Sequence, residues 1–446
     1  MLGHMGKSGV WYAGFAVYAA GVALFSGPGL DQWWGTWAAV GYALAAVVVN
    51  LTAGRAWGGR AAVTLAVAGA VVAPSVWLMT REPTGPDVAV AVRAGVLLLH
   101  HGSPYLPTAA LSAGGWLAYY PYLPVMALFG VPAAIGVPGD TQTWLIAVTF
   151  LLLYATFRVM FAARDGALGG ALGEALGGAR RRDALGQAAF WLACPIMAFP
   201  LAMGINDPPV IALTCLALAL LDRHRRTANG RPWGRDLLLG ALVLGVACAM
   251  KYTAWPAFAI IAVLVAARDG LRPAVRFAGI VLGAAAGLVV ALAPGALAHP
   301  SSILQNTLAY PLGLTAAKSP AASPLPGHLI ASLGSGGHLA ALVLLALAGL
   351  ATAASLVIAP PATPAAAARR IAIGLSALFL LSPATRFGYF IYPIALYWWA
   401  ARADGRGPRA GIDVRLPEVS TPGEAAGLGE ARPGDRQRAA YLVARG

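Results

Sequence analysis

The chain has 446 residues, of which 59% are hydrophobic and only 11% are charged, and its formal net charge is +14. A soluble domain carries about 25% charged residues, so this composition excludes an ordinary soluble protein and indicates an integral membrane protein. Charge-free runs at 8–30, 32–54, 61–80, 141–157 and 184–206 are mostly long enough for a helix to cross roughly 30 Å of hydrocarbon. The predicted fold class is an all-α polytopic membrane protein.

The positive charge is concentrated in short segments between the apolar runs. Arginines gather within 55–60, 180–182, 223–226, 268–276 and 369–370. This distribution follows the positive-inside rule and argues against nucleic acid as a partner. We therefore expect these loops and both termini on the cytoplasmic side, with membrane lipids around the helices. The three cysteines, Cys194, Cys215 and Cys248, show neither metal-ligand nor disulfide spacing.

About twelve crossings are predicted. In chain order they lie at 9–27, 34–52, 61–80, 143–163, 187–204, 208–222, 237–250, 253–267, 274–297, 338–358, 370–384 and 387–401. Short segments among them are paired around polar turns at Asp207, Lys251 and Arg386. We expect these ends to dip into a wet cavity lined by protein, since irregular backbone is not tolerated against lipid.

Two long segments, 81–140 and 298–337, are expected to be external loops, the second covering the first. Residues 119–137 are apolar, but a crossing there would turn the arginines at 180–182 outward. Because prolines break helices, this stretch is predicted to be a re-entrant or interfacial segment. Residues 88–99, apolar except for Arg93, predict a helix along the membrane surface.

Isolated acids stand out in the predicted external turns. Asp87, which follows Gly85-Pro86, is either a general base or the N-cap of the next helix. Asp207, which precedes Pro208-Pro209, is either an N-cap or a substrate contact, and the same alternatives apply to Asn206.

The isolated cations favour phosphate binding. Lys251 and Arg386 are each the only charge in an external turn, and both suit an anionic lipid phosphate. Each cation also has a structural interpretation. Lys251 could extend its side chain to the membrane interface, and Arg386 could belong to an interfacial belt of aromatic residues. His100 and His101 lack further ligands at a spacing that would predict a metal site.

An acid near two phosphate-binding cations is what transfer from a lipid phosphate requires. The base activates the acceptor hydroxyl, and the cations stabilise charge on the departing phosphate. A transporter or flippase of a polyprenyl-phosphate-linked lipid would use the same cations, although the chain shows no internal repeat. A non-catalytic scaffold leaves the isolated charges unexplained.

The ordered set of motifs between about 80 and 400 resembles glycosyltransferase family 87. These are polyprenol-phosphate-mannose-dependent α-1,2-mannosyltransferases of actinobacterial type, in the GT-C superfamily, and the order is also similar to eukaryotic GPI mannosyltransferase I. The motifs are Asp87, Gly102-Ser103-Pro104-Tyr105, Tyr120-Pro121-Tyr122-Leu123-Pro124, Gly204-Ile205-Asn206-Asp207, Lys251 with Pro256, and Ser382-Pro383-Ala384-Thr385-Arg386-Phe387-Gly388-Tyr389 with Tyr392-Pro393.

The resemblance implies a GT-C fold and metal-independent, inverting transfer of a sugar, here mannose, without a cofactor. The donor is a polyprenyl-phosphate sugar, and a lipid or glycan accepts the sugar on the outer face of the cell membrane. By position, Asp87 is the catalytic base, and Lys251 with Arg386 holds the donor phosphate. The residues expected to line the sugar or acceptor site are Asn206, Asp207, Tyr105, Tyr120, Tyr389 and Tyr392.

The chain departs from this family pattern near Asp87. Three predicted helices precede this residue instead of the usual one, so 1–60 is interpreted as a two-helix addition to a catalytic core at 61–401. Val88-Ala89-Val90 stands where a tyrosine is common, and a single acid replaces the pair found in some relatives. Residues 402–446 are polar and predict a disordered cytoplasmic tail.

Overall fold

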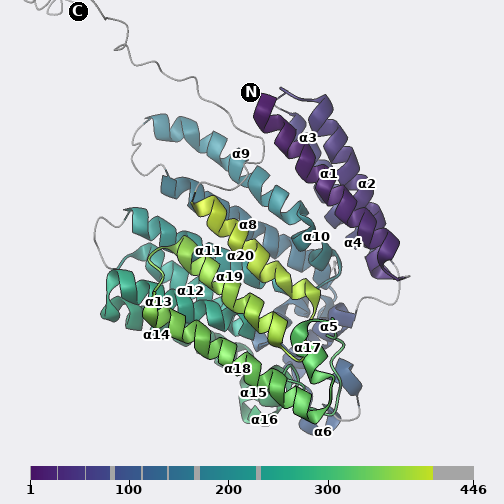
Figure 1. Cartoon of the computed structure of the whole chain (residues 1–446), viewed down its shortest axis with the longest axis vertical. Coiled ribbons are helices and arrows are strands. Elements are labelled where there is room, and N and C mark those ends of the chain that lie inside the picture. The colour runs from purple at the N-terminus through teal and green to yellow at the C-terminus, as the bar shows by residue number, and fades with distance from the viewer. Residues whose placement is uncertain are drawn as a thin grey trace, which may run out of the picture. The chain divides into compact units, whose positions relative to one another are not determined.

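The computed structural model describes residues 2–27, 29–55, 57–80, 86–111, 114–137, 140–164, 171–227 and 233–404. These residues belong to one compact unit and form helices joined by turns (Figure 1). The one isolated bridge among them is parallel and joins Ala322 to Thr385. The predicted all-α class is confirmed. The predicted tail lies, from residue 405 on, outside the described residues.

The N-terminal part consists of three long helical segments that pack closely. They are α1 (Leu2–Phe25), α2 (Leu30–Leu51), and α3 (Gly58–Val67) continued through a π-helical turn (Ala68–Val72) into α4 (Ala73–Met79). A Cβ on Gly41 would come within 2.6 Å of Gly69 Cα, so α2 and the π turn touch backbone to backbone. Small residues permit this close approach between membrane helices. The proposed boundary at residue 60 stays a prediction.

The remaining long helices form the bundle. They are α8 (Thr141–Arg164), α9 (Ala171–Ala193), α10 (Pro195–Ala202), α11 (Asp207–Thr227), α12 (Arg235–Met250), α13 (Trp255–Asp269), α14 (Leu271–Leu292), α18 (Ser335–Ile358), α19 (Pro364–Leu381) and α20 (Ile391–Ala403). The axes of α9 and α10 differ by 67°. The bend lies at Cys194, whose backbone is extended because the following Pro195 disfavours the helical conformation.

All twelve predicted crossings coincide with helical segments. Among the described residues, seven helices are long and apolar enough to span a membrane, or eight when the bent α9–α10 pair is taken as one span. The other four segments lie in α1, α11, α12 and α20, which do not meet this criterion. The described residues therefore contain seven or eight candidate spans, whereas the full count of twelve stays a prediction.

The first predicted external loop is a series of short elements. It contains α5 (Pro86–His101), α6 (Thr108–Leu111), 3-10 turns at Gly115–Ala118 and Pro124–Phe129, and α7 (Val131–Ala134). No helix in the described residues 114–137 exceeds six residues. The prediction that this apolar stretch is broken is confirmed, because a spanning helix needs about 20 residues.

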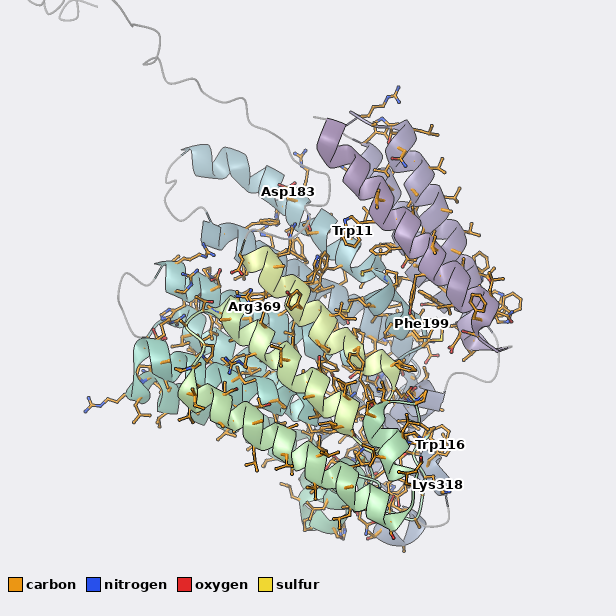
Figure 2. The ribbon with its side chains drawn as sticks, in the orientation of Figure 1. Trp11, Trp116, Asp183, Phe199, Lys318 and Arg369 are labelled. Carbon is orange, nitrogen blue, oxygen red and sulfur yellow. The ribbon has the colours of Figure 1, made fainter. Side chains whose placement is uncertain are left out.

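The second predicted loop packs against the first. It contains α15 (Pro294–Ala298), α16 (Pro300–Leu304), a π-helical turn (Gln305–Ala309) and α17 (Pro326–Ala331). Figure 1 shows α5, α6, α15, α16 and α17 at one end of the bundle. The rings of Tyr119 and Tyr310 stack at 4.4 Å between their centroids, which joins the two loops. Trp116 and Lys318, one from each loop, also lie at this end (Figure 2).

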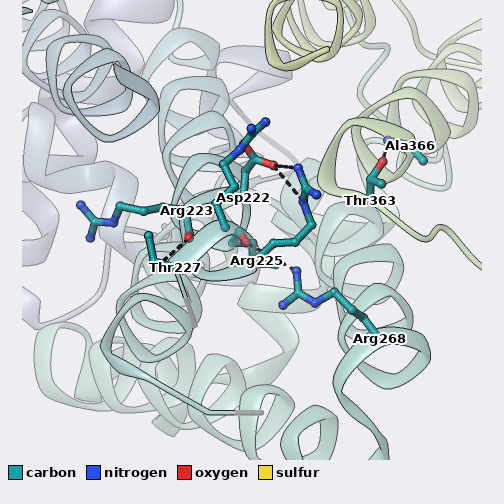
Figure 3. A network of polar contacts seen from close by, with 9 residues as sticks. Asp222, Arg223, Arg225, Thr227, Arg268, Thr363 and Ala366 are labelled. Carbon is teal, nitrogen blue, oxygen red and sulfur yellow. Dashed lines mark hydrogen bonds and ion pairs between the residues drawn. The ribbon is translucent and has the colours of Figure 1, made fainter. Parts of the chain in front are cut away.

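The arginine-rich segments contain paired charges. Asp222 lies near the C-terminal end of α11, and Figure 3 shows the polar contacts around it. Asp222 accepts hydrogen bonds from Arg225 and Arg226, and Arg223 pairs with Asp236 of α12. The expected cytoplasmic location of these segments stays a prediction.

Candidate functional site

A pocket with a volume of about 70 Å³ lies where the two loops meet the helix ends. Four of the residues lining it are charged, namely Asp87, Asp207, Lys251 and Arg386. Much of the remaining wall is aromatic, and it consists of Trp116, Tyr119, Tyr122, Tyr252, Tyr310 and Tyr389. The three polar turns predicted to face a wet cavity therefore meet at one place.

Asp87 and Arg386 form an ion pair at the pocket. Arg386 Nη1 lies 3.6 Å from Asp87 Oδ2, and the two side chains are 34% and 26% exposed. Helix α5 begins at Pro86, so Asp87 lies inside the first turn, not in the capping position before it. A carboxylate is favoured there by the partial positive charge of the helix N-terminus. Both side chains remain accessible to a ligand.

The protonation of Asp87 is controlled by opposing effects. Burial raises the pKa of its carboxyl above the ordinary value, and Asp207 also raises it, while Arg386 and Lys251 lower it. For Arg386, burial lowers the pKa, but the Asp87 carboxylate raises it and the net result is an increase. A carboxyl group with a raised pKa accepts a proton more readily, as a general base must.

The second ion pair is deeply buried. Lys251 is the extended residue between α12 and the 3-10 turn Tyr252–Ala254. Its Nζ donates to Asp207 Oδ1 at 2.5 Å, and the two side chains are 5% and 3% exposed. The ammonium also lies 5.1 Å from the ring centroid of Tyr122 and 5.4 Å from that of Tyr389. The carboxylate and the ring faces stabilise a cation that burial alone would disfavour.

Arg93 fixes the aromatic part of the first loop. From α5 its guanidinium donates to the carbonyl oxygens of Leu117, Ala118 and Tyr119, at 3.2 Å for Ala118 and 3.5 Å for Tyr119. Hydrogen bonds from a charged donor are among the stronger ones in proteins. Arg93 therefore holds the segment that presents Tyr119 to the pocket.

The second loop fixes the turn that carries Arg386. Thr385 N donates to Ala321 O at 2.8 Å, and Ser323 N donates to Thr385 O at 2.9 Å. The Ser323 hydroxyl oxygen accepts from Phe387 N at 3.1 Å. Because these contacts bracket Arg386 on both sides, the loop sets the position of its side chain.

Of the other residues expected at the site, one lines the pocket and four do not. Tyr389 lines the pocket, whereas Tyr105, Tyr120, Asn206 and Tyr392 are buried and do not line it in this structure. Tyr105 supports the wall, since its hydroxyl donates to Tyr122 O at 2.8 Å. Both polar side-chain atoms of Asn206 lack a hydrogen-bond partner among the described residues. The roles of these residues stay predictions.

Several residues that line the pocket were not predicted as site residues, although Tyr122 belongs to one of the motifs that carry the family resemblance. Tyr119 and Tyr122 lie in the segment Tyr119-Tyr120-Pro121-Tyr122, where the aromatic density is a local signal. Tyr310 and Ser319 lie in the second loop and have no comparable signal. Only the packing of the two loops brings them to the site.

The helices and their candidate spans define a polytopic all-α membrane protein, and the family match below is consistent with a GT-C-like fold. The chain belongs to glycosyltransferase family 87, whose family model matches residues 120–383. No curated protein and no solved structure matches the chain. The matched stretch contains Asp207 and Lys251 but neither Asp87 nor Arg386, which the fold brings into the same pocket.

Proposed function

We propose that this membrane glycosyltransferase moves mannose from a polyprenyl-phosphate donor to a hydroxyl of a lipid or glycan acceptor, with inversion, on the outer face of the cell membrane. The observation that carries the proposal is the Asp87–Arg386 pair, an acid and a partly exposed arginine that line one pocket. Mannose and the polyprenyl donor are what the sequence resemblance implies.

In the proposed reaction the acceptor oxygen attacks the anomeric carbon of the donor sugar. The bond between that carbon and the phosphate oxygen breaks, and polyprenyl phosphate leaves with one additional negative charge. Asp87 takes the proton of the acceptor hydroxyl. Arg386 and Lys251 stabilise the charge that develops on the leaving phosphate.

Donor binding itself activates the base in this scheme. The donor phosphate competes with Asp87 for Arg386, whose guanidinium has several N–H donors. Because Arg386 lowers the pKa of Asp87, loss of this partner raises it. The carboxylate becomes a stronger base once the donor is present.

The decisive experiment is Asp87→Asn in reconstituted membranes supplied with mannosyl-phosphoryl-polyprenol and a glycolipid acceptor extract. We expect transfer to be abolished while the labelled donor still binds, because the amide keeps the shape of the side chain but cannot accept the proton. Asp31→Asn is the matched control, since Asp31 is an exposed acid at the start of α2. Near-normal turnover by Asp87→Asn would refute its role as the base.

A transporter of the same lipid is the second candidate, because Arg386 is accessible and suits a phosphate without chemistry. Sealed liposomes with labelled donor on one side separate the two functions. Label on a new acceptor supports the transferase, whereas label that changes sides and stays on the donor supports a flippase.

A further inference from the structure

A large apolar cavity of about 920 Å³ lies among the membrane helices. Its walls come from α1, α9, α10, α19 and α20, and none of the described residues that line it is charged. They include the large apolar side chains of Trp11, Phe15, Phe190, Ile394 and Trp398. A cavity of this size and chemistry suits a long hydrocarbon chain and not a sugar.

The bend between α9 and α10 shapes the cavity. Cys194 and Ile196, on either side of Pro195, line it, so the 67° change of direction opens space between α1 and α20. Phe190 joins the two outer walls, because its ring centroid lies 6.0 Å from that of Phe15 and 5.9 Å from that of Trp398. Trp11, labelled in Figure 2, extends the α1 wall.

Neighbouring residues of one turn line the charged pocket and the apolar cavity. Arg386 and Tyr389 line the charged pocket, while Phe390 and Pro393 line the apolar cavity. The two spaces therefore border the same 3-10 turn, Phe387–Phe390, and the start of α20. From Pro393 to Ala401 the wall follows α20 for roughly 12 Å away from the pocket.

We propose that this cavity holds the prenyl chain of the lipid donor, with α1 as one of its walls. The assignment rests on the proposed function, which places the donor phosphate at Arg386. In this arrangement a chain attached to that phosphate passes the turn Phe387–Phe390, which contributes Tyr389 to the pocket and Phe390 to the cavity. Trp11, Phe15 and all of α20 lie outside the stretch matched by the family model, so the flanks of the chain supply much of this site.

A second apolar cavity of about 300 Å³ provides the matched control. It lies between α13, α18 and α19, and Ala353 is part of its wall. None of its lining residues lies in the turn that carries Arg386. Ala353→Trp therefore fills an apolar space of the bundle without obstructing the proposed path of the donor.

The test compares Ala377→Trp, which fills the large cavity, with wild type and Ala353→Trp. Each receives a long-chain polyprenyl donor and a geranyl donor with the same sugar. Displacing a few buried carbon atoms weakens binding about tenfold, so we expect at least that rise in KM for the long donor. The geranyl donor should be unaffected, as should both donors with Ala353→Trp. Equal effects on both donors, or no effect of Ala377→Trp, would overturn the proposal.

Photolabelling distinguishes a failure of the site from a failure of the function. A polyprenyl phosphate with a photoreactive distal end, without sugar, is irradiated with the full-length protein. We expect labelled peptides from α1 or α20, lost in Ala377→Trp but retained in Ala353→Trp. Labelling elsewhere rejects the cavity whatever the enzymatic result. Labelling here without sugar transfer by wild type rejects the transferase but keeps the lipid site.

Discussion

Asp87 and Arg386 are far apart in the chain, yet Arg386 Nη1 lies 3.6 Å from Asp87 Oδ2. Asp87 is placed by the first turn of α5, and Arg386 by the second loop, which hydrogen-bonds the backbone on both sides of it. Each residue changes the pKa of the other. This mutual dependence makes pH profiles the most direct probe of the site.

Arg386→Gln should shift the acidic limb of kcat/KM to higher pH. As the proposed base, Asp87 must be ionised, so we expect activity to fall as pH drops through its pKa, which burial has already raised. Arg386 lowers this pKa, and its removal raises it further. The measurement is kcat/KM against pH. Arg158→Gln, an exposed site on α8, should leave the limb unchanged. A shift to lower pH in Arg386→Gln would contradict the assignment.

For wild type, the acidic limb of kcat should lie at higher pH than that of kcat/KM. The pH profile of kcat reports the pKa values of the enzyme with substrates bound, and the profile of kcat/KM reports those of the free enzyme. A bound donor phosphate takes Arg386 from Asp87 and adds negative charge, and both effects raise the pKa of the carboxyl. Coincident limbs would show that the donor leaves the Asp87–Arg386 pair intact.

Lys251→Met should destabilise the protein strongly, because it leaves Asp207 as an uncompensated buried charge. Breaking such a pair costs about 3–5 kcal/mol, whereas replacing both partners by apolar groups is often nearly neutral. Lys251→Met combined with Asp207→Leu should therefore recover most of the stability but no activity. Thermal unfolding in detergent measures the first effect, and sugar transfer the second. Recovered activity in the double variant would exclude both residues from the mechanism.

Arg93→Met should lower kcat/KM while the bundle remains folded. A hydrogen bond to a charged group contributes about 1.5–3 kcal/mol, so loss of these contacts should cost tenfold or more if the loop moves. The loop around Trp116 should also become more sensitive to protease. Arg93→Lys keeps a donor and should restore part of the activity. Unchanged proteolysis together with lowered activity would point to a role of Arg93 other than positioning the loop.

Much of the fold is determined by local sequence. A membrane helix needs only a sufficiently long apolar run, because lipid takes the place of a specific packing partner. Each run predicted to cross is indeed helical, and the proline-rich stretch at 119–137 is broken as expected. The turns at Asp207, Lys251 and Arg386 were recognised for the same local reason, since an isolated charge is conspicuous among apolar residues.

The partners of these charges were decided only by the tertiary structure. Nothing in the local sequence joins Lys251 to Asp207, brings Tyr310 onto Tyr119, or leaves Asn206 buried beside the pocket instead of in its wall. These contacts join residues that are far apart in the chain. The packing of the two loops and the positions of the helix ends bring those residues together. The sequence by itself determined which charged residues are isolated among apolar segments and are therefore candidates for the site. The tertiary structure decided which of them meet, because charge pairing and ring stacking act over only a few ångströms.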